Sequence, residues 1–74
     1  MTPAATAFAS RTVIAFVELL AIAGDQLEAA SKAVEAGELD QAVDQLRAAS
    51  DLARQAGTGA FCLATTIEAE RVRP

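Results

Sequence analysis

The amino-acid sequence predicts an all-α protein: a long antiparallel helical hairpin that self-associates into a four-helix bundle. Good helix formers such as Ala, Leu, Glu and Gln dominate the chain, and no run of alternating β-branched residues predicts a strand. Apolar and charged residues each recur every seven positions, which is typical of helices that pack along a seam. For a chain of 74 residues we expect a single domain, 1–74.

The first helix is expected over residues 3–36. Thr2 is a suitable N-cap, and Pro3 fits the first helical position because the N–H group that proline lacks would have no partner there. The predicted apolar seam consists of Val13, Leu20, Leu27 and Val34, joined by Phe16, Ala23 and Ala30. The charged residues that follow the same spacing on the outer side are Arg11, Glu18, Asp25 and Lys32.

A turn at about residues 37–38 is expected to divide the chain. Gly37 suits the left-handed conformation that commonly ends a helix. Glu38 and Asp40 would then lie in the first turn of the next helix, where negative charge is favourable. Because the connection is short, the two helices must run antiparallel.

The second helix is expected over residues 39–72. Its predicted seam has two lines, one of Leu39, Leu46, Ala53, Ala60 and Ile67 and the other of Ala42, Ala49, Ala56 and Leu63. Four ion pairs at helical spacing are expected to support the helices: Asp44 with Arg47, Asp51 with Arg54, Glu68 with Arg71, and Glu28 with Lys32. Asp44 and Asp51 also mark the outer side of this helix.

The folded-back chain is expected to set large residues of the first helix against small residues of the second. In this arrangement Leu20 lies near Ala53, and Phe16 lies near Ala56 and Gly57. The residues predicted to hold the hairpin together are Leu20, Leu27, Val34, Leu39, Val43 and Leu46. The alternative is a fold of three or four shorter helices, broken at Gly24 and at 57–59.

An apolar surplus near the open end of the hairpin predicts an interface. The chain has 19 alanines but only 18 Val, Ile, Leu and Phe residues, so one hairpin buries little area and would gain from a partner. The first helix is apolar nearly all round, which is typical of a helix buried nearly all round. The predicted interface residues are Phe8, Ile14, Phe16, Val17, Leu19, Ile22 and Phe61. A second copy is the expected partner, and a different protein is the alternative.

The segment at about residues 26–53 resembles a single tetratricopeptide-repeat hairpin. The matching positions are Ala30, Gly37, Leu39, Ala42, Leu46 and Ala49. The segment departs from that repeat at Gln26, where a bulky aromatic is usual, and at Arg54, where the closing proline is usual. The resemblance implies a peptide-binding adaptor with a groove lined by the first helix. The chain carries one such unit, whereas repeat arrays need about three.

Catalysis is not expected. The chain has no His and a single cysteine, Cys62, so it lacks the residues of a Cys–His or Ser–His nucleophilic site and of a structural zinc site. We therefore predict no enzyme activity, no catalytic residues, no metal and no cofactor. The net charge of −4 and the scattered basic residues argue against nucleic-acid binding.

A cytoplasmic location is expected, without a membrane span. The most apolar run, residues 13–23, is about half the length that a membrane helix needs and contains Glu18. Taken together, the sequence predicts a non-catalytic interaction or structural module that acts through an apolar helical surface. The alternatives from other classes are the peptide-binding adaptor and a small carrier that holds an apolar ligand in a helical bundle.

Overall fold

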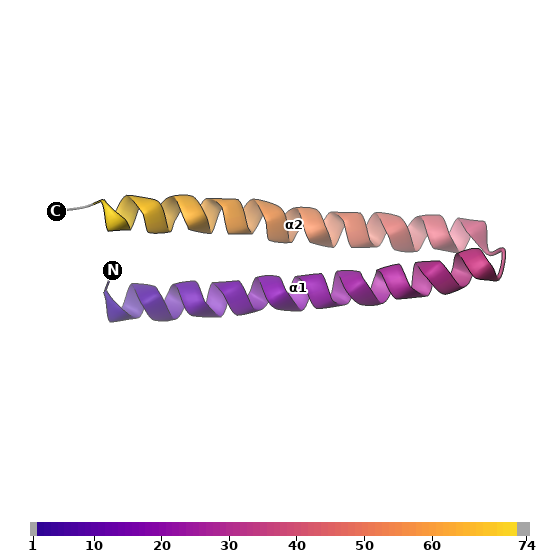
Figure 1. Ribbon diagram of the computed structural model, residues 1–74, viewed down its shortest axis with the longest axis horizontal. Helices are drawn as coiled ribbons and strands as arrows, with labels where there is room; N and C mark the ends of the chain where they lie inside the picture. The colour runs from indigo at the N-terminus through magenta and orange to yellow at the C-terminus, as the bar shows by residue number, and fades with distance from the viewer. Residues whose placement is uncertain (1, 73–74) are drawn as a thin grey trace.

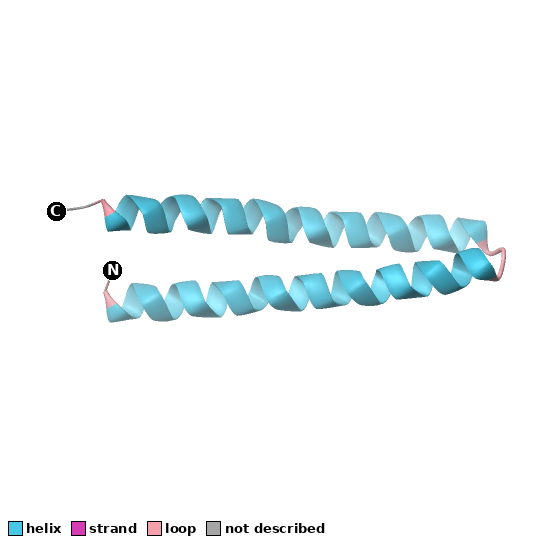
Figure 2. Ribbon diagram, viewed as in Figure 1, coloured by secondary structure: helices cyan, strands magenta, loops and turns pink. Residues whose placement is uncertain are grey.

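A computed structural model, which describes residues 2–72, shows two long helices joined by a tight turn (Figure 1). Helix α1 spans Pro3–Glu35 and helix α2 spans Leu39–Arg71. The helices pack side by side and antiparallel, and Figure 2 shows only helix and loop in the described part of the chain. The hairpin measures 59 by 16 by 11 Å between Cα atoms. The predicted all-α hairpin is therefore confirmed.

The start of α1 is capped as its sequence predicts. Thr2 has an extended backbone, with φ −72° and ψ 158°, and its Oγ1 accepts a hydrogen bond of 3.1 Å from the N–H of Ala5. Pro3 occupies the first helical position. A side-chain cap of this kind stabilises a helix by about 1 kcal/mol.

The turn reverses the chain through one left-handed residue. Gly37 has a φ of +76°, a conformation that is costly for residues with a Cβ atom. Its N–H donates to the carbonyl of Val34 at 3.1 Å, and the N–H of Glu38 donates to the carbonyl of Ala33 at 2.8 Å. These two bonds satisfy carbonyls that the end of α1 would otherwise leave without partners.

Both helices run without interruption through their internal glycines. Gly24 lies within α1, and Gly57 and Gly59 lie within α2. The alternative of three or four shorter helices is therefore wrong. A single glycine costs a helix about 1 kcal/mol, and the strong helix formers on both sides outweigh that cost.

The seam between the helices consists of small residues. Within residues 2–72 every buried residue is an alanine: Ala9, Ala23, Ala30, Ala33, Ala42, Ala49 and Ala56. Half-buried residues complete a second inward line at the same seven-residue spacing, among them Thr12, Leu19 and Gln26 on α1 and Gln45, Leu52 and Gly59 on α2. Two lines of the predicted seam face inward: the line through Ala23 on α1 and the line through Ala49 on α2.

The other half of the predicted seam is wrong. The six large residues expected to hold the hairpin together keep between 44% and 62% of their surface exposed: Leu20, Leu27, Val34, Leu39, Val43 and Leu46. The alanine seam allows the two backbones to come close, and this closeness leaves no room for larger side chains between them. A seven-residue repeat runs along both the alanine line and the neighbouring leucine line, so the repeat alone does not say which line faces inward.

The helices lie closest beside the turn and separate toward the termini, as Figure 1 shows. The larger residues of the inward line lie in that direction, at Phe16 on α1 and Leu63 on α2, and Ala9 beyond Phe16 is again a small residue. The ring of Phe16 lies against Gly59, where an added Cβ atom would be 2.5 Å from Cε1 and 2.7 Å from Cζ of that ring. Gly57, the predicted neighbour of Phe16, has nothing within 4 Å of such a Cβ.

Candidate interaction surface

One side of the hairpin is a continuous surface of aliphatic side chains, which we call the aliphatic face. Two shallow grooves on it show which residues of α1 and α2 share this side. Leu20 and Leu27 line one groove with Leu46 and Ala53, and Val13, Val17 and Leu20 line the next with Ala60 and Ile67. The same seven-residue spacing extends the line of face residues on each helix toward the turn. The aliphatic face comprises Val13, Val17, Leu20, Leu27, Val34, Leu39, Val43, Leu46, Ala53, Ala60 and Ile67.

The aliphatic face carries no charged side chain between residues 10 and 67. Six positions that flank its two lines hold small uncharged residues, namely Ser10, Gly24, Ser31, Ser50, Gly57 and Ala64, whereas Asp40 and Arg47 lie one helical turn from Val43 near the turn. An apolar surface that continues along most of a hairpin is unusual for a protein that remains alone in water. The face therefore has the character of a contact surface.

Most of the charges lie on the backs of the helices. Arg11, Glu18, Asp25 and Lys32 are all exposed along one side of α1, as the sequence predicts. On α2, Asp51 and Arg54 form an ion pair at 3.2 Å, with 64% and 72% of the two side chains exposed. Among the described residues this is the one predicted pair that closes, and exposed pairs contribute only a few tenths of a kcal/mol.

The opposite side of the hairpin is mixed in character. Near the turn it is polar, with Lys32, Glu38, Gln41 and Gln45 around a shallow hollow. The Oε1 atom of Gln45 is buried there without a hydrogen-bond partner. Seven-residue spacing places Phe8 and Ile22 of α1 on this side, separated by alanine. It therefore lacks the unbroken apolar surface of the aliphatic face.

The predicted interface residues do not gather on one surface. Five of them are exposed, and Phe16 and Leu19 are half-buried in the seam between the helices. Val17 lies on the aliphatic face, whereas Phe8 and Ile22 lie on the opposite side. Ile14 and Phe61 project from the backs of their helices. Of the aliphatic face, the sequence predicts only Val17 as an interface residue, because the seven-residue repeat places most of the other leucines and valines in the hairpin's own seam.

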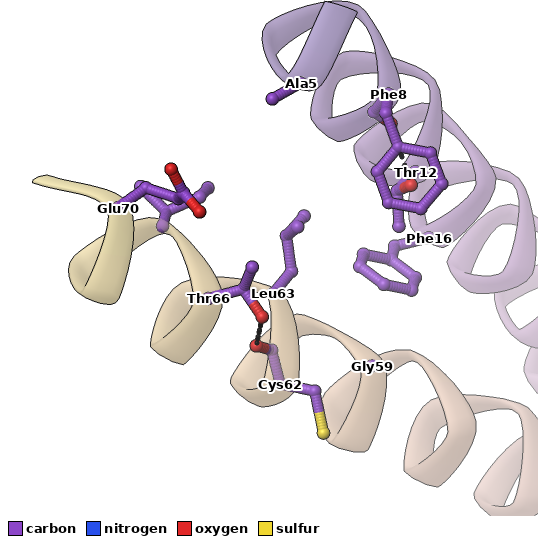
Figure 3. Close-up of a pocket in the computed structure, with 10 residues that line it drawn as sticks. Ala5, Phe8, Thr12, Phe16, Gly59, Cys62, Leu63, Thr66 and Glu70 are labelled. Atoms are coloured by element: carbon purple, nitrogen blue, oxygen red, sulfur yellow. Dashed lines mark hydrogen bonds between the residues drawn. The ribbon is translucent and has the colours of Figure 1, made fainter. Parts of the chain in front are cut away.

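A cavity of about 350 Å³ opens between the helices near their free ends (Figure 3). The Phe16 ring points across it toward α2, near Gly59 and Leu63. The hydroxyls of Thr12 and Thr66 donate to carbonyls of their own helices, those of Phe8 and Cys62, at 2.8 and 3.0 Å. Because these donors are already used, the cavity offers a mainly apolar surface, and Glu70 is the charged residue that lines it. Cys62 is an exposed thiol at its edge.

No group of three metal-binding side chains comes together anywhere in residues 2–72. No protein-family model, curated protein or solved structure matches the chain. The surface chemistry of the hairpin is therefore the basis for inferring its function.

Helix α1 is long enough and apolar enough to cross a membrane, by length and composition, and most of its apolar stretch is exposed on the isolated hairpin. Core helices of soluble proteins and signal sequences share these two properties. The expected absence of a membrane span, and the cytoplasmic location, therefore stay predictions.

Proposed function

We propose that this protein is a non-catalytic interaction or structural module that acts by homo-oligomerisation through an apolar helical surface. The observation that supports the proposal is the distribution of apolar side chains. Most of the large ones are exposed, and within residues 2–72 only alanines are fully buried. A four-helix bundle formed from two hairpins would give the large side chains a core.

The energetics favour association over a solitary hairpin. Full burial of a large aliphatic side chain contributes about 1.5–3 kcal/mol, whereas alanine offers much less area to remove from water. The aliphatic face holds eight Val and Leu side chains that are at least 44% exposed, in addition to the half-buried Ile67. Covering them supplies the stabilisation that a chain of this size gains only weakly from its own core.

The mass in solution tests this proposal. Light scattering behind size exclusion, over a hundredfold range of chain concentration, should give a dimer or larger assembly that dissociates on dilution. A monomer at every concentration would contradict the proposal. That result would favour the alternative, a peptide-binding adaptor that works as a monomer.

A second candidate function is the carriage of a small apolar ligand, and the cavity between the free ends of the helices favours it. Mass spectrometry of an organic extract of the purified protein should then reveal a bound apolar compound. Replacing Phe16 by Ala, which removes the ring that crosses the cavity, should change the amount retained. Retention of no apolar compound by either protein would remove this candidate.

We also propose that the protein works in an aqueous compartment, with the cytoplasm as the expected one. The charged line on α1, from Arg11 to Lys32, would be costly in a bilayer but is well placed on the outside of a bundle. Co-sedimentation with phospholipid vesicles should leave the protein in the supernatant. Recovery with the vesicles after a high-salt wash would favour membrane insertion of α1.

A further inference from the structure

The aliphatic face is apolar, and its surface is also uneven. On α1 the bulky side chains of Val13, Val17 and Leu20 form a ridge. At the same level on α2, the positions that continue the face are small: Ala53, Gly57 and Ala60. The shared grooves place this ridge directly beside the channel of small residues. Over this part of the hairpin, one copy therefore presents a protruding line on α1 and a receding line on α2.

We infer that a second copy of this chain covers the aliphatic face, with a two-fold axis parallel to the long axis of the hairpins. Both turns then lie at the same end of the dimer. This inference deepens the proposed function and depends on it, since it names the face and the arrangement through which the chain would self-associate.

The direction of the two-fold axis follows from the positions of the ridge and the channel. Rotation about an axis parallel to the helices lays α1 of each copy on α2 of the other at the same level. The ridge of each copy then enters the channel of the other, and the sizes match. Rotation about the perpendicular axis in the same plane would set ridge on ridge and channel on channel. That arrangement would leave a void along both channels, and voids are costly in a core.

The size of the face suits a dimer. The hairpin extends over 59 by 16 Å in the plane that contains both helices, which is roughly 900 Å². Stable complexes bury about 800 Å² on each partner. A uniform, uncharged surface of this length also offers no feature by which a charged peptide would be selected, whereas it is complementary to itself.

The distribution of charge predicts how the dimer responds to salt. Residues 25–51 hold seven acids and two bases, and the inferred arrangement brings two such halves to the same end. These side chains are exposed, so they repel one another through water and are screened beyond about 8 Å at physiological ionic strength. Added sodium chloride should therefore tighten the dimer.

A pair of matched variants tests the face. Leu20 and Ile22 are 53% and 49% exposed and lie two residues apart on α1, on opposite sides of the hairpin. Leu20→Glu should raise the dimer dissociation constant at least about 100-fold, whereas Ile22→Glu should change it less than about threefold. Leu20→Ala, a milder change, should weaken association by about tenfold while leaving the helicity at high concentration unchanged.

The outcomes separate the inference from the proposed function. Dissociation by Ile22→Glu but not by Leu20→Glu would place the contact on the opposite side, so the inferred face would be wrong while self-association stands. A wild-type chain that is monomeric throughout would overturn both.

A distance measurement tests the arrangement of the two copies. In a Cys62→Ser background, Ala36→Cys places a single spin label at the exposed C-cap that follows α1. With both turns at one end, the two labels should lie within about 30 Å, since helices are about 10–12 Å in diameter. A distance close to the 59 Å length of the hairpin would mean that the turns lie at opposite ends, and would overturn the inferred axis.

Discussion

The inner seam and the aliphatic face of this hairpin follow the same seven-residue repeat but use opposite kinds of residue. The seam is made of alanines that are at most 9% exposed, whereas the face is built around leucines and valines that are about half exposed. Small residues set how closely the two helices pack, and large residues hold most of the apolar area that can still be buried. The difference indicates that the hairpin determines its geometry internally and gains stability from what covers it.

The seam should be the region least tolerant of added volume. Ala30 is 2% exposed, so Ala30→Leu would force the helices apart and should destabilise the protein by about 2–3 kcal/mol. Ala21→Leu, on the exposed back of the same helix, is the matched control and should change stability by less than about 0.5 kcal/mol. Chemical unfolding followed by circular dichroism measures both. Equal stability of the two variants would mean that the helices are not in close contact at Ala30.

The aliphatic face should behave as a buried surface in the assembled protein. Leu46 is 46% exposed in the single hairpin, and Leu46→Ala should cost about 1–2 kcal/mol if a partner covers it. The control is Arg47→Ala on the back of α2, for which little change is expected. Urea unfolding at a fixed, high chain concentration gives both values. If Leu46→Ala were as mild as the control, the leucine would remain exposed to water.

The prediction from sequence was accurate for the helices and for the turn but not for their rotation. Thr2, Pro3 and Gly37 act through local backbone geometry, which can be recognised in the sequence without knowledge of the partner helix. Which line of residues forms the seam depends instead on which of two gains is larger. Burying Leu20 and Leu27 would gain more area, whereas burying Ala23 and Ala30 brings the backbones closer. The seven-residue pattern is the same for both outcomes.

The candidate site was harder to predict for the same reason. Once Leu20 and Leu46 were assigned to the hairpin core, only the residues left over could be assigned to an interface, and these project in several directions. A usable signal in the sequence is the small uncharged residue at several flanking positions, such as Ser31 and Ser50. A solvent-facing flank of a coiled coil usually carries Glu and Lys.

Replacing a glycine by alanine should have a smaller effect, and the effect should differ between the seam and the exposed part of the hairpin. Gly59→Ala would bring a Cβ atom to 2.5 Å from the Phe16 ring, whereas Gly24→Ala would meet nothing within 4 Å. Both changes raise helix propensity by about 1 kcal/mol. We therefore expect Gly24→Ala to be more stable than wild type by about that amount, and Gly59→Ala to lose the gain as the ring shifts. Thermal unfolding of the two variants measures both changes in stability. An equal rise in the two unfolding midpoints would contradict the close approach of Phe16 to Gly59.

The smallest effect is expected outside both regions. Arg54→Ala removes the exposed ion pair with Asp51 and should change the free energy of unfolding by less than about 0.5 kcal/mol. Its oligomeric mass should equal that of wild type, because Arg54 lies on the back of α2. A clear loss of mass would show that the contact extends beyond the aliphatic face.

The dependence of the thermal midpoint on chain concentration tests most directly whether a second copy covers the aliphatic face. When unfolding separates two chains, mass action makes the folded state more stable at higher concentration. We predict that the midpoint of the helical signal rises steadily as the wild-type chain is concentrated over two orders of magnitude, and that Leu20→Glu lowers the midpoint and flattens the rise. A wild-type midpoint that does not change with concentration would mean that the hairpin is stable alone with its leucines exposed, and would contradict this conclusion.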